Sequence, residues 1–137
     1  MASDPVALAT SLLRALEAGQ CGENLRKYFA PTASTVEHPN LLKPAGARAT
    51  LDQMLAASEF GAGLMSSQRY DVRSAAAVGD TAILRLTWSG VIARAAGPFR
   101  RGDELVAHIA QFVETADGLI TSIETFDCYE PFDTQVV

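Results

Sequence analysis

The stretch ELVAHIAQFVETADGLITSIETFDCYEPF, residues 104–132, predicts a β-hairpin that organises the rest of the fold. Two segments rich in Val, Ile, Phe, Thr and Tyr flank Asp117-Gly118, a dipeptide typical of a two-residue turn with positive φ at both positions. With that turn, counting back along both strands places His108 opposite Asp127. Opposite residues share a face of the sheet, so this register puts an imidazole and a carboxylate together on an otherwise apolar strip. A longer turn would make them a diagonal pair.

Three helices are predicted upstream of the hairpin. Asp4 (or Ser3 before it) is a side-chain cap, and Pro5 suits the first helical position. A short second helix is predicted over about 23–29. Thr50 and Gln53 have the spacing of a capping box and begin the third helix, which Gly61 or Gly63 is expected to end.

Alternating apolar and polar residues predict long strands over 68–78 and 81–93, and a short strand is predicted at 33–36. Residues 39–47, with two prolines and Gly46, are predicted to form a loop at the lip of a pocket. Helices followed by four long antiparallel strands are an α+β pattern. A sheet that curls strongly around about three small helices forms a cone with an internal pocket. Residues 1–137 are predicted to be a single domain.

Composition restricts the partners and the location. The net charge of −5 and the pI near 4.9 argue against nucleic acid or an anionic membrane surface as a partner. No apolar run approaches the roughly 20 residues of a membrane span, and Asp4 precedes any basic residue, unlike a signal peptide. The cytoplasm is therefore the expected location. The two cysteines and two histidines have no metal-ligand spacing, so neither a metal nor a cofactor is expected.

Two local strings resemble a known family. The segment LRKYFAPTASTVEHPN, residues 25–40, resembles the helix, strand and loop of the nuclear-transport-factor-2-like superfamily. The tail, with DGLI followed by a strand ending in FDCYEPF, resembles the SnoaL-like branch. The resemblance implies a cone fold that forms a homodimer through its sheet. The superfamily includes ketosteroid isomerases, polyketide cyclases, epoxide hydrolases, dehydratases and non-enzymatic modules, so the fold alone does not decide the activity.

The ketosteroid isomerases carry a Val-Glu-Asp-Pro string whose aspartate is the proton-shuttling base. In this chain the string is Val-Glu-His-Pro at residues 36–39, so His38 takes the place of the base. The position of their oxyanion-hole tyrosine falls on Leu12, which cannot donate a hydrogen bond, and the strand around His108 to Ala110 lacks their protonated aspartate. These departures argue against a steroid isomerase as such.

Polyketide cyclases carry an acid/base aspartate on the last strand and a histidine on a neighbouring strand. Asp127 and His108 are similar to that pair in placement and are the preferred catalytic residues, with His38 as the third candidate. Each has a structural alternative: His108 and Asp127 as partners in the core or in an interface, and His38 as a solvated loop residue. Glu37 is expected at the surface.

Large apolar and aromatic side chains are expected to line the pocket or to pack in the core. The expected lining residues are Tyr28, Phe29, Val36, Met54, Phe60, Tyr70, Trp88, Phe112, Ile123 and Tyr129. The sequence thus favours a protein that binds a small apolar or polycyclic molecule and acts as a cofactor-free isomerase, cyclase or dehydratase by proton transfer. The alternative is a non-catalytic binding or dimerisation module with a cone filled by Trp88, Phe112 and Met54.

Overall fold

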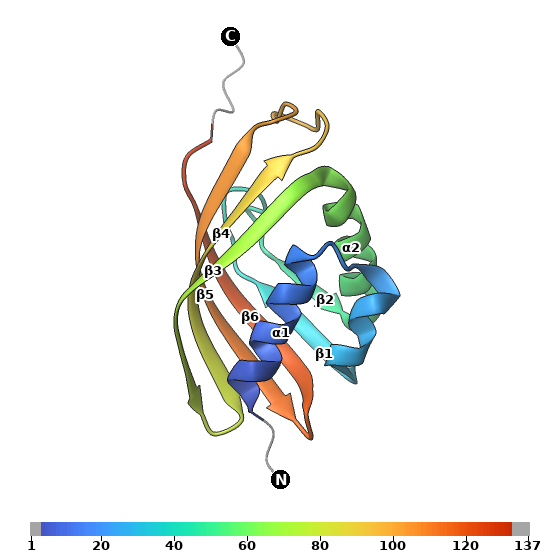
Figure 1. The fold of residues 1–137 in the computed structure, drawn as a ribbon, viewed down its shortest axis with the longest axis vertical. Helices are drawn as coiled ribbons and strands as arrows, with labels where there is room; N and C mark the ends of the chain where they lie inside the picture. The colour runs from blue at the N-terminus through green and yellow to red at the C-terminus, as the bar shows by residue number, and fades with distance from the viewer. Residues whose placement is uncertain (1–3, 133–137) are drawn as a thin grey trace.

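A six-stranded sheet wraps around a helix in the computed structural model, which describes residues 4–132 (Figure 1). The elements in chain order are α1 (Pro5–Glu17), the 3₁₀ helix η1 (Gly22–Tyr28), β1 (Phe29–Glu37), β2 (Ala47–Thr50), α2 (Leu51–Leu64), β3 (Met65–Val78), β4 (Thr81–Ile92), β5 (Glu104–Ala116) and β6 (Leu119–Tyr129). None of the described helices is both long and apolar enough to cross a membrane.

The strand order is β2-β1-β6-β5-β4-β3, and only β1 and β6 run parallel among the paired strands. The sheet curls without closing, and α1 lies in its concave side (Figure 1). We call the face toward α1 the inner face and the opposite face the outer face. The predicted α+β fold, with a curved and mainly antiparallel sheet around three helices, is confirmed.

Local signals explain both α-helices. The Asp4 carboxylate accepts hydrogen bonds from the backbone N–H groups of Val6 and Ala7 at 3.0 and 3.2 Å, and Pro5 follows it. The Thr50–Gln53 capping box forms as predicted, with bonds of 3.3 and 2.9 Å. The expectation that Gly61 or Gly63 ends α2 was wrong, because the helix continues to Leu64 and leads directly into β3.

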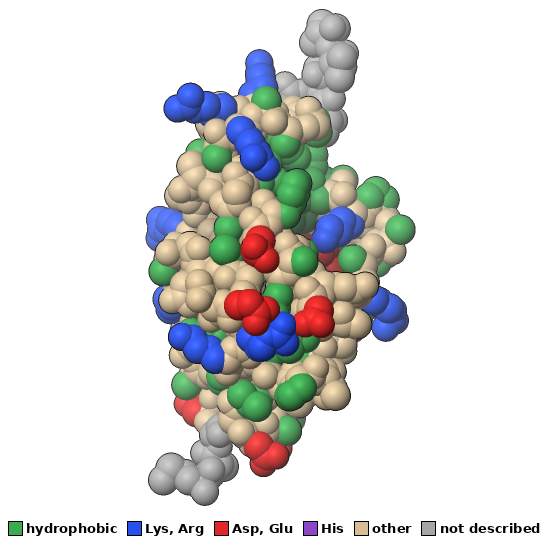
Figure 2. All heavy atoms as spheres, turned by 90° about the vertical axis from the view of Figure 1, so that its right-hand side faces the viewer, with side chains coloured by type: hydrophobic (Ala, Val, Ile, Leu, Met, Phe, Trp, Pro, Cys, Tyr) green, Lys and Arg blue, Asp and Glu red, His purple; other side chains and the backbone are tan. Residues whose placement is uncertain are grey.

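The core lies between α1 and the inner face. Its largest fully buried side chains are Leu13, Leu84, Leu86, Ile92, Val113 and Ile120. Figure 2 shows the side of the molecule that lies on the right in Figure 1, where η1 and α2 are exposed. Acidic and basic side chains lie close together on this side, and no histidine is visible there. Arg26 of η1 joins the two elements, because its guanidinium lies 2.8 Å from both Glu23 and Asp52.

The predicted hairpin turn is present, but the register beyond it differs from the prediction. Asp117 and Gly118 have φ angles of 52° and 77°, and Ala116 lies opposite Leu119. Thr115 then pairs with Ile120 and Glu114 with Ser122, so one β6 residue between them has no partner. This residue, Thr121, is a β-bulge.

The bulge moves every later β6 residue to the face opposite the one predicted, because side chains alternate along a strand. His108 lies opposite Cys128 on the outer face, and Asp127 lies opposite Ile109 on the inner face. The predicted pairing of His108 with Asp127 was therefore wrong.

Candidate functional site

The concave side of the sheet contains a cavity of about 370 Å³ that opens to solvent. It lies between the inner face of the sheet, the ends of α1 and α2, and the loop formed by residues 38–46. Its lining residues are Leu16, Gln20, Glu37, Leu42, Lys43, Ser58, Gly61, Ala62, Met65, Gln68, Tyr70, Trp88, Ile109, Gln111, Thr125, Asp127 and Tyr129. The cone is therefore not filled, in contrast to the expectation of the non-catalytic alternative. We call this space the inner cavity.

Asp127 is a partly buried carboxyl group in the inner cavity. The Thr125 hydroxyl donates a hydrogen bond of 2.5 Å to its Oδ1. Burial raises the pKa of Asp127 above its usual range, although the Thr125 hydrogen bond opposes the rise. The Glu37 carboxylate raises this pKa further, and Lys43 lowers it. A partly buried carboxyl group with a raised pKa suits proton transfer.

Glu37 is a cavity residue, and the prediction that it lies at the surface was wrong. Only 21% of its side chain is exposed. Its Oε1 lies 3.2 Å from Nζ of Lys43, and its Oε2 accepts a hydrogen bond of 2.8 Å from the Asn40 side-chain amide. Its inward direction follows from the parallel register with β6, in which Glu37 lies beside Thr125. The sequence carries no local signal of this pairing.

Hydrogen bonds and a glycine fix the conformation of the loop that follows Glu37. The Asn40 side-chain oxygen accepts hydrogen bonds of 3.0 Å from the backbone N–H groups of both Leu42 and Lys43. Gly46 has a φ of 71°, and a Cβ atom there would lie 2.7 Å from the carbonyl oxygen of Glu37. This geometry brings Leu42 and Lys43 to the cavity.

Aromatic side chains form one wall of the inner cavity. Nε1 of Trp88 donates a hydrogen bond of 3.0 Å to the Gln68 side chain, which fixes the plane of the indole. The Tyr129 ring meets the indole edge-on at 6.2 Å between centroids. Burial and the charge of Asp127 raise the pKa values of Tyr70 and Tyr129, so both phenols are neutral hydrogen-bonding groups at ordinary pH.

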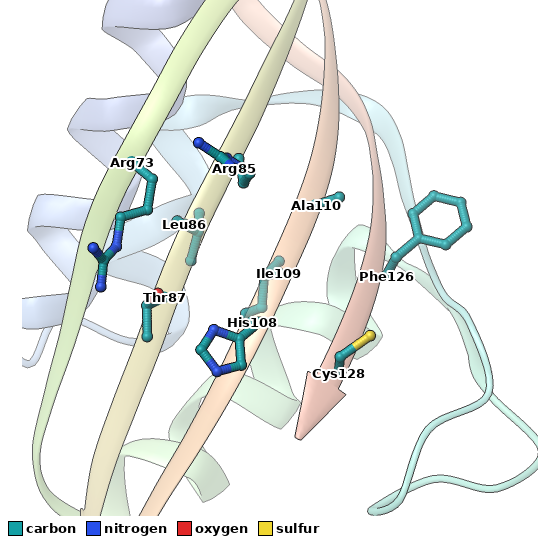
Figure 3. A pocket seen from close by; sticks show the side chains of 9 residues that line it. All are labelled: Arg73, Arg85, Leu86, Thr87, His108, Ile109, Ala110, Phe126 and Cys128. Atoms are coloured by element: carbon teal, nitrogen blue, oxygen red, sulfur yellow. The ribbon is translucent and has the colours of Figure 1, made fainter. Parts of the chain in front are cut away.

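His108 lies outside the inner cavity. It lines an open groove of about 520 Å³ on the outer face, where Arg73, Arg85 and Thr87 lie near it (Figure 3). Its Nε2 lies 2.8 Å from Oε2 of Glu130, and 57% of its side chain is exposed. This groove is larger than the inner cavity, and the sheet separates it from Asp127.

His38 also points away from the inner cavity. Because side chains alternate along an extended chain, His38 faces outward where Glu37 faces inward. Its ring stacks on Phe126 at 4.2 Å with an angle of 17° between the planes, and its Nε2 lies 2.7 Å from Oε2 of Glu124. The three predicted catalytic residues are therefore not brought together, since only Asp127 lines the inner cavity.

Of the ten side chains expected to line the pocket, Tyr70, Trp88 and Tyr129 do so. The other seven lie elsewhere. Phe29 and Ile123 are buried in the core, Tyr28 and Met54 pack against it, Val36 and Phe112 belong to the outer face, and Phe60 is 65% exposed. Strand alternation explains the outer positions, and the side of α2 that carries Phe60 faces solvent.

Several residues that line the inner cavity were not predicted from the sequence. Lys43, Gln68 and Gln111 are polar residues that reach the inner cavity through the loop geometry and the strand register. Within residues 4–132, no group of three His, Cys, Asp or Glu side chains is arranged to hold a metal ion.

Comparison with known proteins identifies the fold. No family profile and no curated protein matches the chain, but solved structures do. IdmH, a candidate polyketide cyclase from Streptomyces antibioticus, matches with a TM-score of 0.75 and 19% identity over 91% of this chain and 92% of its own. AclR, a candidate hydroxylase from Streptomyces galilaeus, matches with a TM-score of 0.74 and 16% identity over 90% and 74%.

A hypothetical protein from Catenulispora acidiphila with a ketosteroid isomerase-like fold matches with a TM-score of 0.65 and 20% identity. This match covers 86% of the present chain and 82% of that protein. The chain therefore shares its fold with solved proteins described as polyketide cyclases and as ketosteroid isomerase-like. At these identities the likeness concerns the fold.

Proposed function

We propose that this protein binds a small, largely apolar molecule in the inner cavity and catalyses a cofactor-free proton transfer in which Asp127 is the acid–base group. The observation that carries the proposal is the partly buried Asp127 carboxyl, whose pKa burial raises, in a cavity of about 370 Å³. Isomerisation, aldol cyclisation and dehydration all need such a group. The description of IdmH as a candidate polyketide cyclase agrees with chemistry of this kind on this fold.

The single tryptophan offers a direct test of ligand binding, because Trp88 lies in the cavity wall. Its fluorescence would be titrated with polycyclic ketones, steroids and terpenoids in the wild type and in Asp127→Asn. We expect a saturable change for at least one class, with an affinity that the substitution alters. Glu124→Asn, on the outer face of the same strand, is the matched control. If no compound of the panel changes the Trp88 fluorescence, the proposal is contradicted.

Catalysis is tested on any ketone that binds. Exchange of the hydrogens next to its carbonyl group would be followed by NMR in D₂O. Removing a positioned acid–base group lowers the rate of proton transfer by about 10²- to 10⁴-fold. We expect a loss of this size in Asp127→Asn, with binding retained. Equal exchange in the two proteins would exclude Asp127 as the acid–base group.

We also propose a homodimer that forms through the outer face of the sheet. This face carries Phe126, which is 39% exposed, and Phe112, which meets it edge-on at 6.0 Å. Sedimentation of the wild type and of Phe126→Glu tests this proposal. A wild type that sediments as a monomer would contradict it. The cytoplasmic location remains a prediction from the sequence.

A further inference from the structure

A second carboxylate lies in the inner cavity next to the strand that carries Asp127. Glu37 at the end of β1 is the direct neighbour of Thr125 on β6, and Asp127 follows two residues later on the same face. Among the described lining residues, Glu37 and Asp127 are the acids and Lys43 is the base. Few charged groups therefore act on the Asp127 carboxyl group.

Both oxygens of the Glu37 carboxylate have partners. Its Oε1 faces the Lys43 ammonium at 3.2 Å, and its Oε2 accepts the Asn40 amide hydrogen at 2.8 Å. Both donors suit an ionised carboxylate. Asn40 also bonds the backbone of Leu42 and Lys43, so the residue that holds Glu37 also holds the loop that carries its counter-ion. With both oxygens occupied, Glu37 is poorly placed to accept a proton from a ligand.

The remaining groups that face Asp127 are uncharged. Thr125 donates its hydroxyl hydrogen to Asp127 from the same strand. Tyr70 of β3 and Tyr129 of β6 are neutral phenols, and burial raises their pKa values. The charges that act on Asp127 from its neighbours are thus the Glu37 carboxylate of β1 and the Lys43 ammonium of the loop.

We propose that Glu37 is a positioning residue that keeps the proton on Asp127, so that Asp127 enters the reaction as a proton donor to an oxygen atom of a neutral ligand. This inference rests on the proposed function and adds the direction of the first proton transfer. A nearby negative charge disfavours the ionised form of a carboxyl group. The ligand class is that of neutral carbonyl compounds or alcohols, since an anionic ligand would meet the Glu37 carboxylate.

With a carbonyl ligand, the proton moves from Asp127 to the ligand and another returns from the ligand to Asp127. The O–H bond of Asp127 breaks and an O–H bond forms on the carbonyl oxygen, which leaves Asp127 as a carboxylate. The Thr125 hydroxyl and the positive charge of Lys43 stabilise that carboxylate. The proton returns to Asp127 from the carbon next to the former carbonyl group, so no proton is gained or lost over the cycle.

The charge relation is tested without any ligand. The ¹³C carboxyl signal of Asp127, assigned by its loss in Asp127→Asn, is followed by NMR through a pH titration of the whole protein. We expect Glu37→Gln to move the midpoint to lower pH and Lys43→Met to move it to higher pH. Glu124→Gln on the outer face and Lys27→Met on η1 make the same charge changes outside the inner cavity and are the controls.

A midpoint that Glu37→Gln leaves at the wild-type value, or moves upward, overturns the inference. If Glu37→Gln fails to fold, Lys43→Met decides in its place, and an unchanged midpoint in that variant overturns the inference equally. Because this titration needs no substrate, its result does not depend on whether the protein is an enzyme.

A second measurement tests whether ligand binding depends on the protonation of Asp127. The affinity of 2-tetralone, a neutral bicyclic ketone, is measured by Trp88 fluorescence across the same pH range. We expect binding to weaken as pH rises through the Asp127 midpoint, and the weakening to occur at lower pH in Glu37→Gln. Binding that is constant through the midpoint overturns the inference and leaves the proposed function intact. Failure of 2-tetralone and of the whole ligand panel to bind overturns the proposed function.

Discussion

His108 lies opposite Cys128 and not opposite Asp127, so the imidazole and the carboxylate occupy different faces of the sheet. This arrangement separates two surfaces that the sequence predicted to be one. The outer groove carries His108 with Arg73 and Arg85 (Figure 3). The inner cavity carries Asp127. Any chemistry that needs both side chains at one ligand is excluded by this register.

The separation of the two residues predicts additive effects on stability. His108→Ala and Asp127→Asn should change the free energy of unfolding independently, within about 0.5 kcal/mol in a double-mutant cycle. Thr125→Val combined with Asp127→Asn is the positive control, because these side chains share a hydrogen bond, and its coupling energy should be about 0.5–3 kcal/mol. A coupling energy of that size between His108 and Asp127 would contradict the register. Urea unfolding of the single and double variants provides the values.

Stability should depend on pH through Asp127. Its pKa is higher in the folded protein than in the unfolded chain, so the folded state binds more protons between the two values. The contribution of Asp127 to the free energy of unfolding is therefore fully present below the unfolded pKa and falls as pH rises toward the folded pKa. Across that interval, Asp127→Asn should gain stability relative to the wild type, and above it the difference should be constant.

Urea unfolding of Asp127→Asn and the wild type at a series of pH values measures this difference. Asp117→Asn, an exposed substitution in the hairpin turn, is the control and should show no comparable trend. A stability difference that is flat, or that falls with rising pH, would show that the Asp127 pKa is not raised in the folded state.

Gly90 should be essential for the position of the cavity tryptophan. A Cβ atom on Gly90 would lie 2.6 Å from Cζ2 of Trp88 and 3.0 Å from Sδ of Met65. Gly90→Ala should therefore displace the indole, weaken its hydrogen bond to Gln68 and destabilise the protein by about 1–3 kcal/mol, the usual cost of overpacking. Trp88 emission and urea unfolding check this, with Thr87→Ala on the outer face as the control. Unchanged emission would contradict the packing.

Gly46 should be more sensitive to substitution than other glycines of similar conformation. Gly46 and Gly97 both have positive φ, at 71° and 54°, but only Gly46 faces a close backbone atom, the Glu37 carbonyl oxygen at 2.7 Å. Gly97→Ala should cost about 1–2 kcal/mol from the left-handed conformation alone, and Gly46→Ala should cost more. Thermal unfolding of the two variants measures these losses of stability. Equal losses would contradict the close approach of Gly46 to the Glu37 carbonyl oxygen.

The elements were predictable because their signals are local. Asp117-Gly118 specifies the turn, and Thr50 with Gln53 specifies the start of α2, through contacts between residues close in sequence. The bulge was not predictable from the hairpin itself. Next to it, Thr115 donates hydrogen bonds from its N–H and its hydroxyl to the carbonyl oxygen of Asp80, at 2.9 and 2.8 Å. Asp80 belongs to the turn between β3 and β4, which is distant in sequence.

The site was less predictable than the fold for the same reason. The sequence predicts that Asp127 is an acid–base residue, but it predicts a partner for Asp127 on β5, the strand next to it in sequence. The second carboxylate comes from Glu37, whose strand pairs with β6 only in the folded sheet. A further irregularity between Phe29 and Ser34 shifts the register of that pairing, so alternation counted along β1 alone does not reveal which side chains face inward.

The bulge at Thr121 has a consequence for how this chain could diverge. Because strand side chains alternate with a period of two, the loss of that one residue would exchange the inner and outer sets of side chains on β6. Phe126 and Cys128 would then face the inner cavity, and Asp127 would face the outside of the sheet next to His108. A one-codon deletion could thus remove the acid from the cavity and create a histidine–aspartate pair on the other face, with no amino acid replaced.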